Sequence, residues 1–360
     1  MKLIKALALT LLISVSVIFS QSTRRPQNII ILIGDGMGAN YVSAAVLNLP
    51  NSPFRKFTSI GFSITCAADK LVTDSAPGAT ALSTGYRTNY YYIGVDTLGN
   101  HLPTIFDEAE RLNLSTGLVV TSTVTHATPA AFVAHTINRK EEKEIAKQFT
   151  NKDIDVVIGG GAKYFSKDGA SSSGSSNFDI LKQKGYDIYT NIEELLNIQP
   201  SNKFYALLEE DQLKRANERN FTLADLTKKA IPILTKNENG FILMIEGSQI
   251  DWGAHENNPE YTLSELSDFC GAINVALDFA EEDGNTLVVV TADHETGGMS
   301  INSGKPDGSE ITMKFTTTGH TAEMVGVFAK GPGEELFRGV YDNFMIGRNL
   351  FHLLNPDFQF

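Results

Sequence analysis

Residues 240–255 read GFILMIEGSQIDWGAH, a continuous apolar run that leads directly into two carboxylates and a histidine. Two other segments repeat the pattern: residues 28–38 read NIIILIGDGMG, and residues 286–295 read TLVVVTADHE. Such runs are typical of parallel strands that are buried on both faces of a sheet. Because ligands bind beyond the carboxyl ends of strands in open α/β sheets, these strand ends predict a shared ligand site.

Helix-like segments alternate with strand-like ones through the rest of the chain. The strand-like segments include 118–124, 155–161 and 325–329, and the helix-like ones include 38–47, 140–149, 223–234 and 260–281. This alternation predicts an α/β fold with a mainly parallel sheet covered on both faces. We interpret residues 21–360 as one domain, in which region 168–216 is a crown or insertion because it carries no cluster of metal-type ligands.

The composition, 42% hydrophobic and 20% charged, is that of a soluble globular protein. The net charge of −12 argues against nucleic acid as a stable partner, because no basic stripe is present to meet phosphate backbones. Residues 1–20 combine two lysines, an apolar run and a terminal Ser20, the pattern of a secretory signal peptide. An uncleaved anchor is the alternative. We expect an exported protein, periplasmic or secreted, without membrane contact after cleavage.

The three strand ends carry the donor types of zinc and magnesium sites. Asp251 and His255 are four residues apart, so on a helix they share a face and can bind one ion. Glu246 ends an apolar strand, where an unpaired carboxylate is costly to bury. Each residue alone also fits an ordinary salt bridge or helix cap. The ligands at the other two strand ends are Asp35, Asp293 and His294. Taken together, the cluster predicts a metal-dependent enzyme.

Ser75, within VTDSAPGATA at residues 72–81, is the candidate nucleophile. Its small neighbours leave room for a phosphate, and a helix from Ala79 onward would favour an anion at its N-terminus. A serine hydroxyl is a weak nucleophile unless a base or a metal activates it. The segment has no GxSxG elbow, which favours activation by a metal.

Three further residues offer ligands or a phosphate clamp. Residues 121–129 follow a strand and present the imidazole of His126 and the hydroxyl of Thr128. His320, in a GHT triplet, supplies another imidazole, although alone it would fit a surface histidine. Arg139 suits bidentate capture of phosphate oxygens, although alone it would fit a solvated helix start.

These motifs resemble those of the alkaline phosphatase family. The resemblance rests on DSAxxAT, GDGMG, ExxxxDxxxH, ADHETGG and the late GHT, in the family's order, from about residue 27 to the C-terminal helix. It implies a three-layer α/β/α sandwich on a large, mainly parallel sheet, and a homodimer. It also implies hydrolysis of small phosphate monoesters to an alcohol and inorganic phosphate through a phosphoserine. Two zinc ions and a third, magnesium-type ion per chain would serve as cofactors.

The resemblance also assigns roles to residues of this chain. The first zinc site would comprise Asp251, His255 and His320, and the second Asp35, Asp293, His294 and Ser75. Asp35 would bridge to a third site with Thr128 and Glu246. Arg139 would bind phosphate, and Asp74 would help to orient the Arg139 side chain. Ser75 and Arg139 would be the catalytic residues.

Two positions depart from the family's common pattern. His126 stands where many members have an aspartate around the third metal, and Trp252 stands where some have a lysine near phosphate. Because imidazole is a softer donor than carboxylate, the third site is expected to accept zinc or cobalt as well as magnesium. Alternatively, His126 only packs nearby.

Sulfatases, phosphodiesterases and phosphomutases could use a related metal pair, and an exported phosphate- or metal-binding protein without turnover is the alternative outside enzymes.

Overall fold

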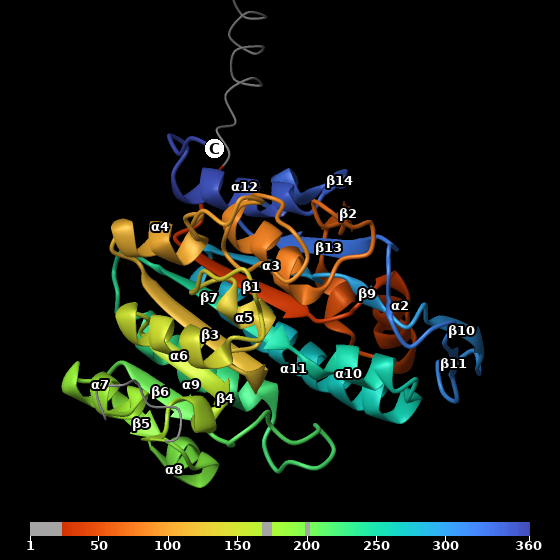
Figure 1. The fold of residues 1–360 in the computed structure, drawn as a ribbon. Helices are drawn as coiled ribbons and strands as arrows, with labels where there is room; N and C mark the ends of the chain where they lie inside the picture. The colour runs from red at the N-terminus through yellow and green to blue at the C-terminus, as the bar shows by residue number, and fades with distance from the viewer. Residues whose placement is uncertain (1–23, 168–174, 199–201) are drawn as a thin grey trace, which may run out of the picture.

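The computed structural model describes residues 24–167, 175–198 and 202–360 (Figure 1). A ten-stranded sheet lies at its centre, in the order β14-β2-β13-β8-β1-β7-β3-β4-β6-β5. Its strands are β1 (Asn28–Gly34), β2 (Ser59–Ile64), β3 (Ser115–Thr123), β4 (Val156–Gly160), β5 (Asp187–Tyr189), β6 (Phe204–Leu207), β7 (Phe241–Gly247), β8 (Thr286–Thr291), β13 (Val325–Lys330) and β14 (Gly339–Asp342). Among these strands only β13 runs antiparallel to its neighbours. The predicted mainly parallel sheet is therefore confirmed.

Helices cover both faces of the sheet, which gives the three layers expected from the resemblance (Figure 1). One face carries α2 (Ala39–Asn48), α9 (Leu223–Leu234) and α11 (Pro259–Asp283), and the other α3 (Ser75–Thr84), α4 (Ile105–Arg111), α6 (Glu142–Asn151) and α12 (Phe344–Leu354). Strand β1 shows why its sequence is apolar throughout. Ile30 and Leu32 enter the core on the α2 side, whereas Ile29, Ile31 and Ile33 enter the core on the α3 side.

Smaller elements complete the described part of the chain. They are α5 (Ala127–Ala130), α7 (Asn177–Gln183), α8 (Ile192–Asn197), α10 (Gln249–His255) and the paired short strands β9 (Glu295–Thr296) with β12 (His320–Thr321) and β10 (Ser300–Ser303) with β11 (Thr312–Lys314). Region 168–216 contributes α7, β5, α8 and β6, and its interpretation as a crown or insertion stays a prediction. The predicted signal peptide lies outside the described residues. Within those residues, no helix has the length and apolar character needed to cross a membrane.

The order of the central strands explains where the site forms. Strands β8, β1, β7 and β3 are consecutive neighbours and run parallel. Their carboxyl ends therefore meet at one edge of the sheet, the usual ligand edge of such folds. Each of these four strands carries a predicted ligand at its carboxyl end. On β7 the ligand is the penultimate residue of the strand, and on the other three strands a ligand follows within three residues. The topology thus brings together residues that are up to about 260 positions apart in the sequence, Asp35 and His294 among them.

Candidate active site

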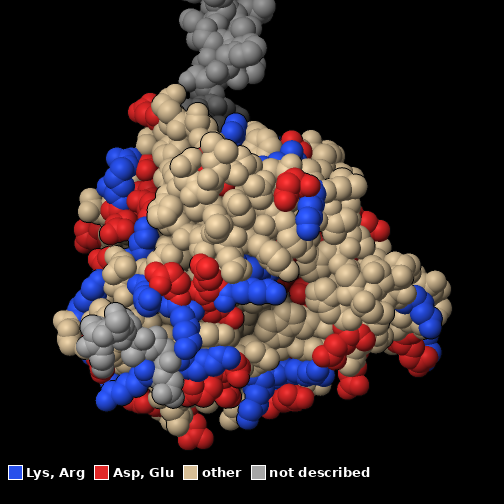
Figure 2. Space-filling view, in the orientation of Figure 1, with Lys and Arg blue, Asp and Glu red and all other residues tan. Residues whose placement is uncertain are grey.

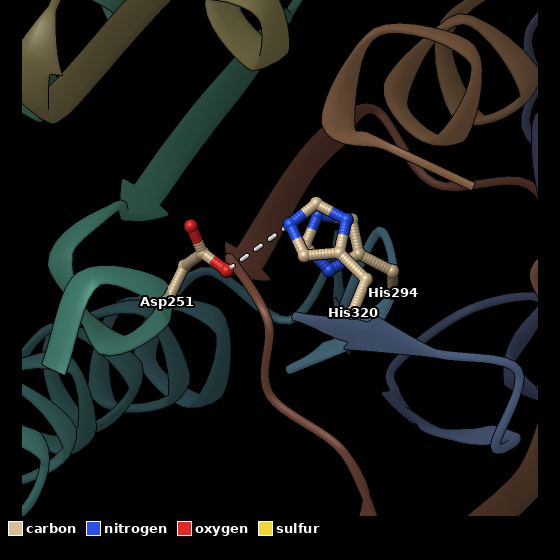
Figure 3. Close-up of side chains that lie close together, drawn as sticks. All are labelled: Asp251, His294 and His320. Atoms are coloured by element: carbon tan, nitrogen blue, oxygen red, sulfur yellow. Dashed lines mark ion pairs between the residues drawn. The ribbon is translucent and has the colours of Figure 1, made fainter. Parts of the chain in front are cut away.

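The first cluster joins α10 to the β9–β12 pair. Asp251 and His255 lie one turn apart on α10, and His255 Nε2 is 3.2 Å from Asp251 Oδ2. His320, on β12, places its Nε2 3.2 Å from His255 Nε2 and 3.7 Å from Asp251 Oδ1. Figure 3 shows the His320 ring stacked on that of His294. The two ring centroids are 3.7 Å apart. The three residues predicted for the first zinc site therefore converge.

The second cluster surrounds His294, which follows β8. His294 Nε2 lies 3.4 Å from Asp35 Oδ1 and 3.3 Å from Asp293 Oδ2. The Oγ atom of Ser75 lies 3.3 Å from the same nitrogen. Asp293 uses its other oxygen, Oδ1, to accept hydrogen bonds from the backbone N–H groups of Gly36 and His294. One carboxylate oxygen is thereby anchored, and the other is left to face the cluster.

The third cluster forms between the ends of β1, β3 and β7. Ligand atoms of Asp35, His126 and Glu246 lie within 4.8 Å of one another. Ser248 donates a hydrogen bond to Glu246 Oε2 (2.6 Å) and fixes that carboxylate at the end of β7. Thr128, at the start of α5, is fully buried, and its hydroxyl has no hydrogen-bond partner among the described residues. The residues predicted for the third site therefore lie together, and His126 is one of them.

Ser75 is the first residue of α3, so the helix begins four residues earlier than the Ala79 start expected from the sequence. Pro77 explains the difference, because proline is tolerated in the first turn of a helix, where its missing N–H has no intrahelical partner. Gly78 permits the helix to approach the second cluster, since a Cβ atom there would lie 2.8 Å from the backbone oxygen of Asp293. Ser75 therefore lies at the N-terminus of α3, which carries a partial positive charge.

Arg139 reaches the site from the segment between α5 and α6. Its Nη1 donates to Asp74 Oδ2 (2.8 Å), and its Nη2 lies 3.0 Å from His126 Nε2. The backbone N–H of Tyr91 donates to the other oxygen of Asp74. Asp74 therefore orients the guanidinium, as the resemblance implied. The Trp252 and His126 rings make a T-shaped contact, with centroids 6.0 Å apart.

Burial makes this concentration of carboxylates unfavourable unless a cation is present. Burial raises the pKa of Asp35 well above its usual range, and the neighbouring carboxylates, with Asp293 first, raise it further. Burial also raises the pKa of Glu246 to about 8 and that of Asp293 to about 6. In His126 the effect is opposite, because burial and then Arg139 lower its pKa to about 3 and keep the ring neutral. A neutral imidazole beside crowded carboxylates is the donor set of a metal site.

Unpartnered atoms support the same conclusion. Both carboxylate oxygens of Asp35, Oδ2 of Asp293 and Nδ1 of His126 are buried without a hydrogen-bond partner among the described residues. Buried polar atoms are nearly always paired, and here the unpartnered atoms belong to residues of the second and third clusters. Metal ions would supply the missing partners, so the residues present fit the metals that the resemblance implied.

Several residues that shape the site were not found by sequence reasoning. Ser248 and Ser122 hold Glu246, Tyr91 holds Asp74, and Thr296 contacts Asp251 and His294. Ser122, Ser248 and Thr296 contribute hydroxyl groups, and Tyr91 contributes a backbone amide. The available signals were position, because Ser248 and Thr296 lie two residues from predicted ligands, and for Thr296 its place in the ADHETGG motif.

Comparison with known proteins identifies the family. The family model described as alkaline phosphatase matches residues 26–314. Alkaline phosphatase 4 of Bacillus subtilis is 33% identical, over an alignment that covers 88% of this chain and 86% of the relative. Alkaline phosphatase of Escherichia coli is 30% identical, with 87% and 83% covered.

Solved structures agree with this result. The alkaline phosphatase of the Antarctic bacterium TAB5 superimposes with a TM-score of 0.86 at 38% identity, covering 92% of this chain and 99% of that one. Variants of the TAB5 enzyme in which a histidine is replaced by glutamate or by aspartate have magnesium bound in a site called M3. By the extent of these matches and by the motifs at its strand ends, the chain belongs to the alkaline phosphatase family of phosphoric monoester hydrolases.

Proposed function

We propose that the chain hydrolyses phosphate monoesters in two displacements at Ser75. The observation that carries the proposal is the position of the Ser75 hydroxyl. It lies at the N-terminus of α3, 3.3 Å from His294 in the second cluster. Asp74, the residue directly before Ser75, accepts a hydrogen bond from the guanidinium of Arg139. In the first displacement Oγ attacks phosphorus, the bond to the alcohol oxygen breaks, and the proton lost by Oγ is balanced by the proton that the leaving alcohol gains. In the second, water attacks the phosphoserine, releases inorganic phosphate and restores the hydroxyl.

The surrounding side chains supply binding and orientation for both steps. Arg139 is charged and fixed by Asp74, so it can hold two phosphate oxygens in a bidentate contact. Trp252 and His126 form the adjoining wall, and we propose that Trp252 contacts bound substrate. The side chain of His255 is 38% exposed, so we propose that the leaving alcohol extends into solvent on that side of the site, which fits small esters of varied structure.

We assign two zinc ions and one magnesium-type ion per chain to the three clusters. Asp251, His255 and His320 would hold the first ion, and Asp35, Asp293, His294 and Ser75 the second. Asp35, Thr128, Glu246 and His126 would hold the third. When bound, such ions supply positive charge that stabilises the attacking and leaving oxygens and lowers the pKa of oxygens that coordinate them.

A comparison of esters tests this function. The purified protein is assayed with p-nitrophenyl phosphate, bis-p-nitrophenyl phosphate and p-nitrophenyl sulfate. Hydrolysis of the monoester at a far higher kcat/KM than the other two is the expected result. Preference for the diester or the sulfate would point to the related metal-dependent classes, and binding of phosphate without turnover would point to a binding protein. The intact nucleophile argues against the binding protein.

We further propose that His126 lowers the preference of the third cluster for magnesium. Magnesium is a hard ion that retains its waters and favours carboxylates, whereas imidazole suits zinc or cobalt. His126 is the imidazole of that cluster, beside Asp35 and Glu246. The magnesium-bound TAB5 variants, in which a histidine gives way to a carboxylate, support the proposal.

Replacement His126→Asp is therefore expected to raise magnesium occupancy and to make activity more dependent on magnesium. Elemental analysis after titration with magnesium and zinc measures the occupancy, and kcat measured over the same titrations gives the dependence. His101→Asp, at an exposed histidine, is the control for an added carboxylate. Equal magnesium affinity in the wild type and His126→Asp would show that His126 only packs near the ion.

For the oligomeric state we propose a homodimer formed through the exposed face of β2. Ile60, Phe62 and Ile64 are exposed by 48%, 38% and 38%, whereas the residues between them are buried. Val340 of the edge strand β14 pairs with Phe62 and lies on the same face. Exposed apolar faces of this kind mark interaction surfaces. Two copies of a chain with a net charge of −12 repel each other, so an uncharged apolar face is the most favourable surface for their contact.

Phe62→Lys is expected to convert the dimer to a monomer, because like charges would face each other across the symmetric contact. Size-exclusion chromatography with light scattering measures the mass at micromolar concentration. Leu98→Lys, at a site 85% exposed, is the matched control and should remain dimeric. A monomeric wild type, or a Phe62→Lys protein that stays dimeric, would contradict this assignment.

A further inference from the structure

Thr296 places one hydroxyl between the first and second clusters. It is fully buried on β9, two residues beyond His294. Its Oγ1 donates a hydrogen bond to Asp251 Oδ1 and lies 3.2 Å from His294 Nδ1. A hydroxyl has a single proton, and a carboxylate can only accept. The proton of Thr296 therefore goes to Asp251, and its oxygen accepts from the Nδ1–H of His294.

These two hydrogen bonds decide which ligand atoms are free. With the proton of His294 on Nδ1, its Nε2 keeps a lone pair, and Nε2 is the atom that lies 3.3 Å from Ser75 Oγ and from Asp293 Oδ2. With Asp251 Oδ1 anchored, Oδ2 faces His255 Nε2 at 3.2 Å. The same side chain thus selects the tautomer of a ligand in one cluster and the orientation of a ligand in the other. Partners of this type fix metal ligands in many proteins.

The surroundings hold Thr296 rigidly in this position. Its backbone oxygen accepts a hydrogen bond from the Tyr41 hydroxyl, and its backbone N–H donates to Gly36 O at 3.1 Å. Thr296 also pairs with His320 across the β9–β12 ladder. Gly36 has a φ of 70°, and a Cβ atom there would lie 2.8 Å from Thr296 Oγ1 and 2.9 Å from Asp251 Oδ1. The glycine leaves space for the hydroxyl and the carboxylate to meet.

We propose that Thr296 is a positioning residue that prepares the first and second clusters together for metal binding. The inference rests on the proposed metal sites, and it adds a residue that would bind no metal itself. Loss of the hydroxyl would free the Asp251 carboxylate and the His294 ring to rotate, and would leave the tautomer of His294 undetermined. Metal affinity should therefore fall at both clusters, although no ligand has been removed.

The experiment compares Thr296→Val, which removes the hydroxyl at nearly constant volume, with Thr296→Ser, which keeps it. Metal-free proteins are titrated with zinc against a chromophoric chelator, and cadmium NMR reports the filling of each cluster separately. Thr296→Val is expected to bind roughly 10- to 100-fold more weakly at both clusters. Thr296→Ser should stay within about threefold of wild type. Thr227→Val, which removes a buried hydroxyl bonded to Leu223 O in α9, controls for a general loss of stability.

Three results would overturn the proposal. They are wild-type affinity in Thr296→Val, a loss confined to one cluster, or a Thr296→Ser protein as weak as Thr296→Val, which would show that the hydroxyl alone does not maintain the metal affinity. If Thr296→Val does not fold, Thr296→Ala compared with Thr296→Ser isolates the same hydroxyl. A wild type that binds no zinc at these clusters would instead refute the proposed function, so the two failures are distinguishable.

Discussion

Ser75→Ala should accumulate no phosphoenzyme and lose roughly 10⁵-fold or more in kcat, because removal of a sole nucleophile commonly costs many orders of magnitude. Ser75 is the only residue of the proposed site whose hydroxyl stands both at the N-terminus of α3 and beside His294. Metal content should change little, since Asp35, Asp293 and His294 remain at the second cluster. Mass spectrometry of acid-quenched reactions measures the phosphoserine, and elemental analysis measures the metal.

Ser83→Ala provides the matched control for this experiment. Ser83 is buried on the same helix, and its hydroxyl donates to Ala131 O at 2.6 Å, away from the clusters. Its replacement should affect stability without affecting the phosphoenzyme. Activity of Ser75→Ala within about tenfold of wild type would reject covalent catalysis and would favour direct attack of water on the bound ester.

The sequence predicted the centre of the molecule well, because the physical constraints there are local. Strands β1, β7 and β8 are buried on both faces and therefore read as unbroken apolar runs. Because these strands are apolar along their length, the polar ligand residues have to lie at their carboxyl ends. The spacing of four between Asp251 and His255 predicts that they share one face of a helix, and both residues lie on α10. Such features need no knowledge of distant parts of the chain.

The edges of the sheet could not be predicted in the same way. Large and small residues alternate along strand β2. The large apolar residues, such as Phe62, are exposed, and the small residues between them are buried. This is the reverse of the pattern expected for an ordinary half-buried strand. Strands β5 and β14 are only three and four residues long. The start of α3 at Ser75 was also missed, because a proline in the first turn resembles a helix breaker when read alone.

Contacts between distant hydroxyls and ligands were likewise beyond sequence reasoning. Thr296 meets Asp251 across 45 positions, and Ser122 meets Glu246 across 124. Nothing in the local pattern of a threonine or a serine indicates such a partner. These contacts depend on the strand order β8-β1-β7-β3 and on Gly36, which together set how closely the loops approach.

Removal of metal should abolish phosphatase activity and lower the Tm, and the charges at the site explain both effects. Asp35, Glu246 and Asp293 are buried together, and burial, with repulsion from neighbouring carboxylates, raises the pKa of each. Without cations these carboxylates oppose folding at neutral pH. A metal that binds only the folded chain contributes about 4 kcal/mol when present at 1,000 times its Kd. The metal-free protein should therefore unfold at a temperature lower by on the order of 10 °C.

Calorimetry and p-nitrophenyl phosphate assays of the same samples measure the two effects, with elemental analysis to confirm that metal is gone. Zinc added back should restore both turnover and Tm, and a chelator already saturated with zinc should change neither. Ser75→Ala is informative here as well. It should show the same fall in Tm on chelation while having almost no activity to lose, because its carboxylates are unchanged. Hydrolysis by protein shown to be free of metal would disprove the metal-dependent mechanism, and an unchanged Tm would mean that the three clusters do not bind ions in the folded chain.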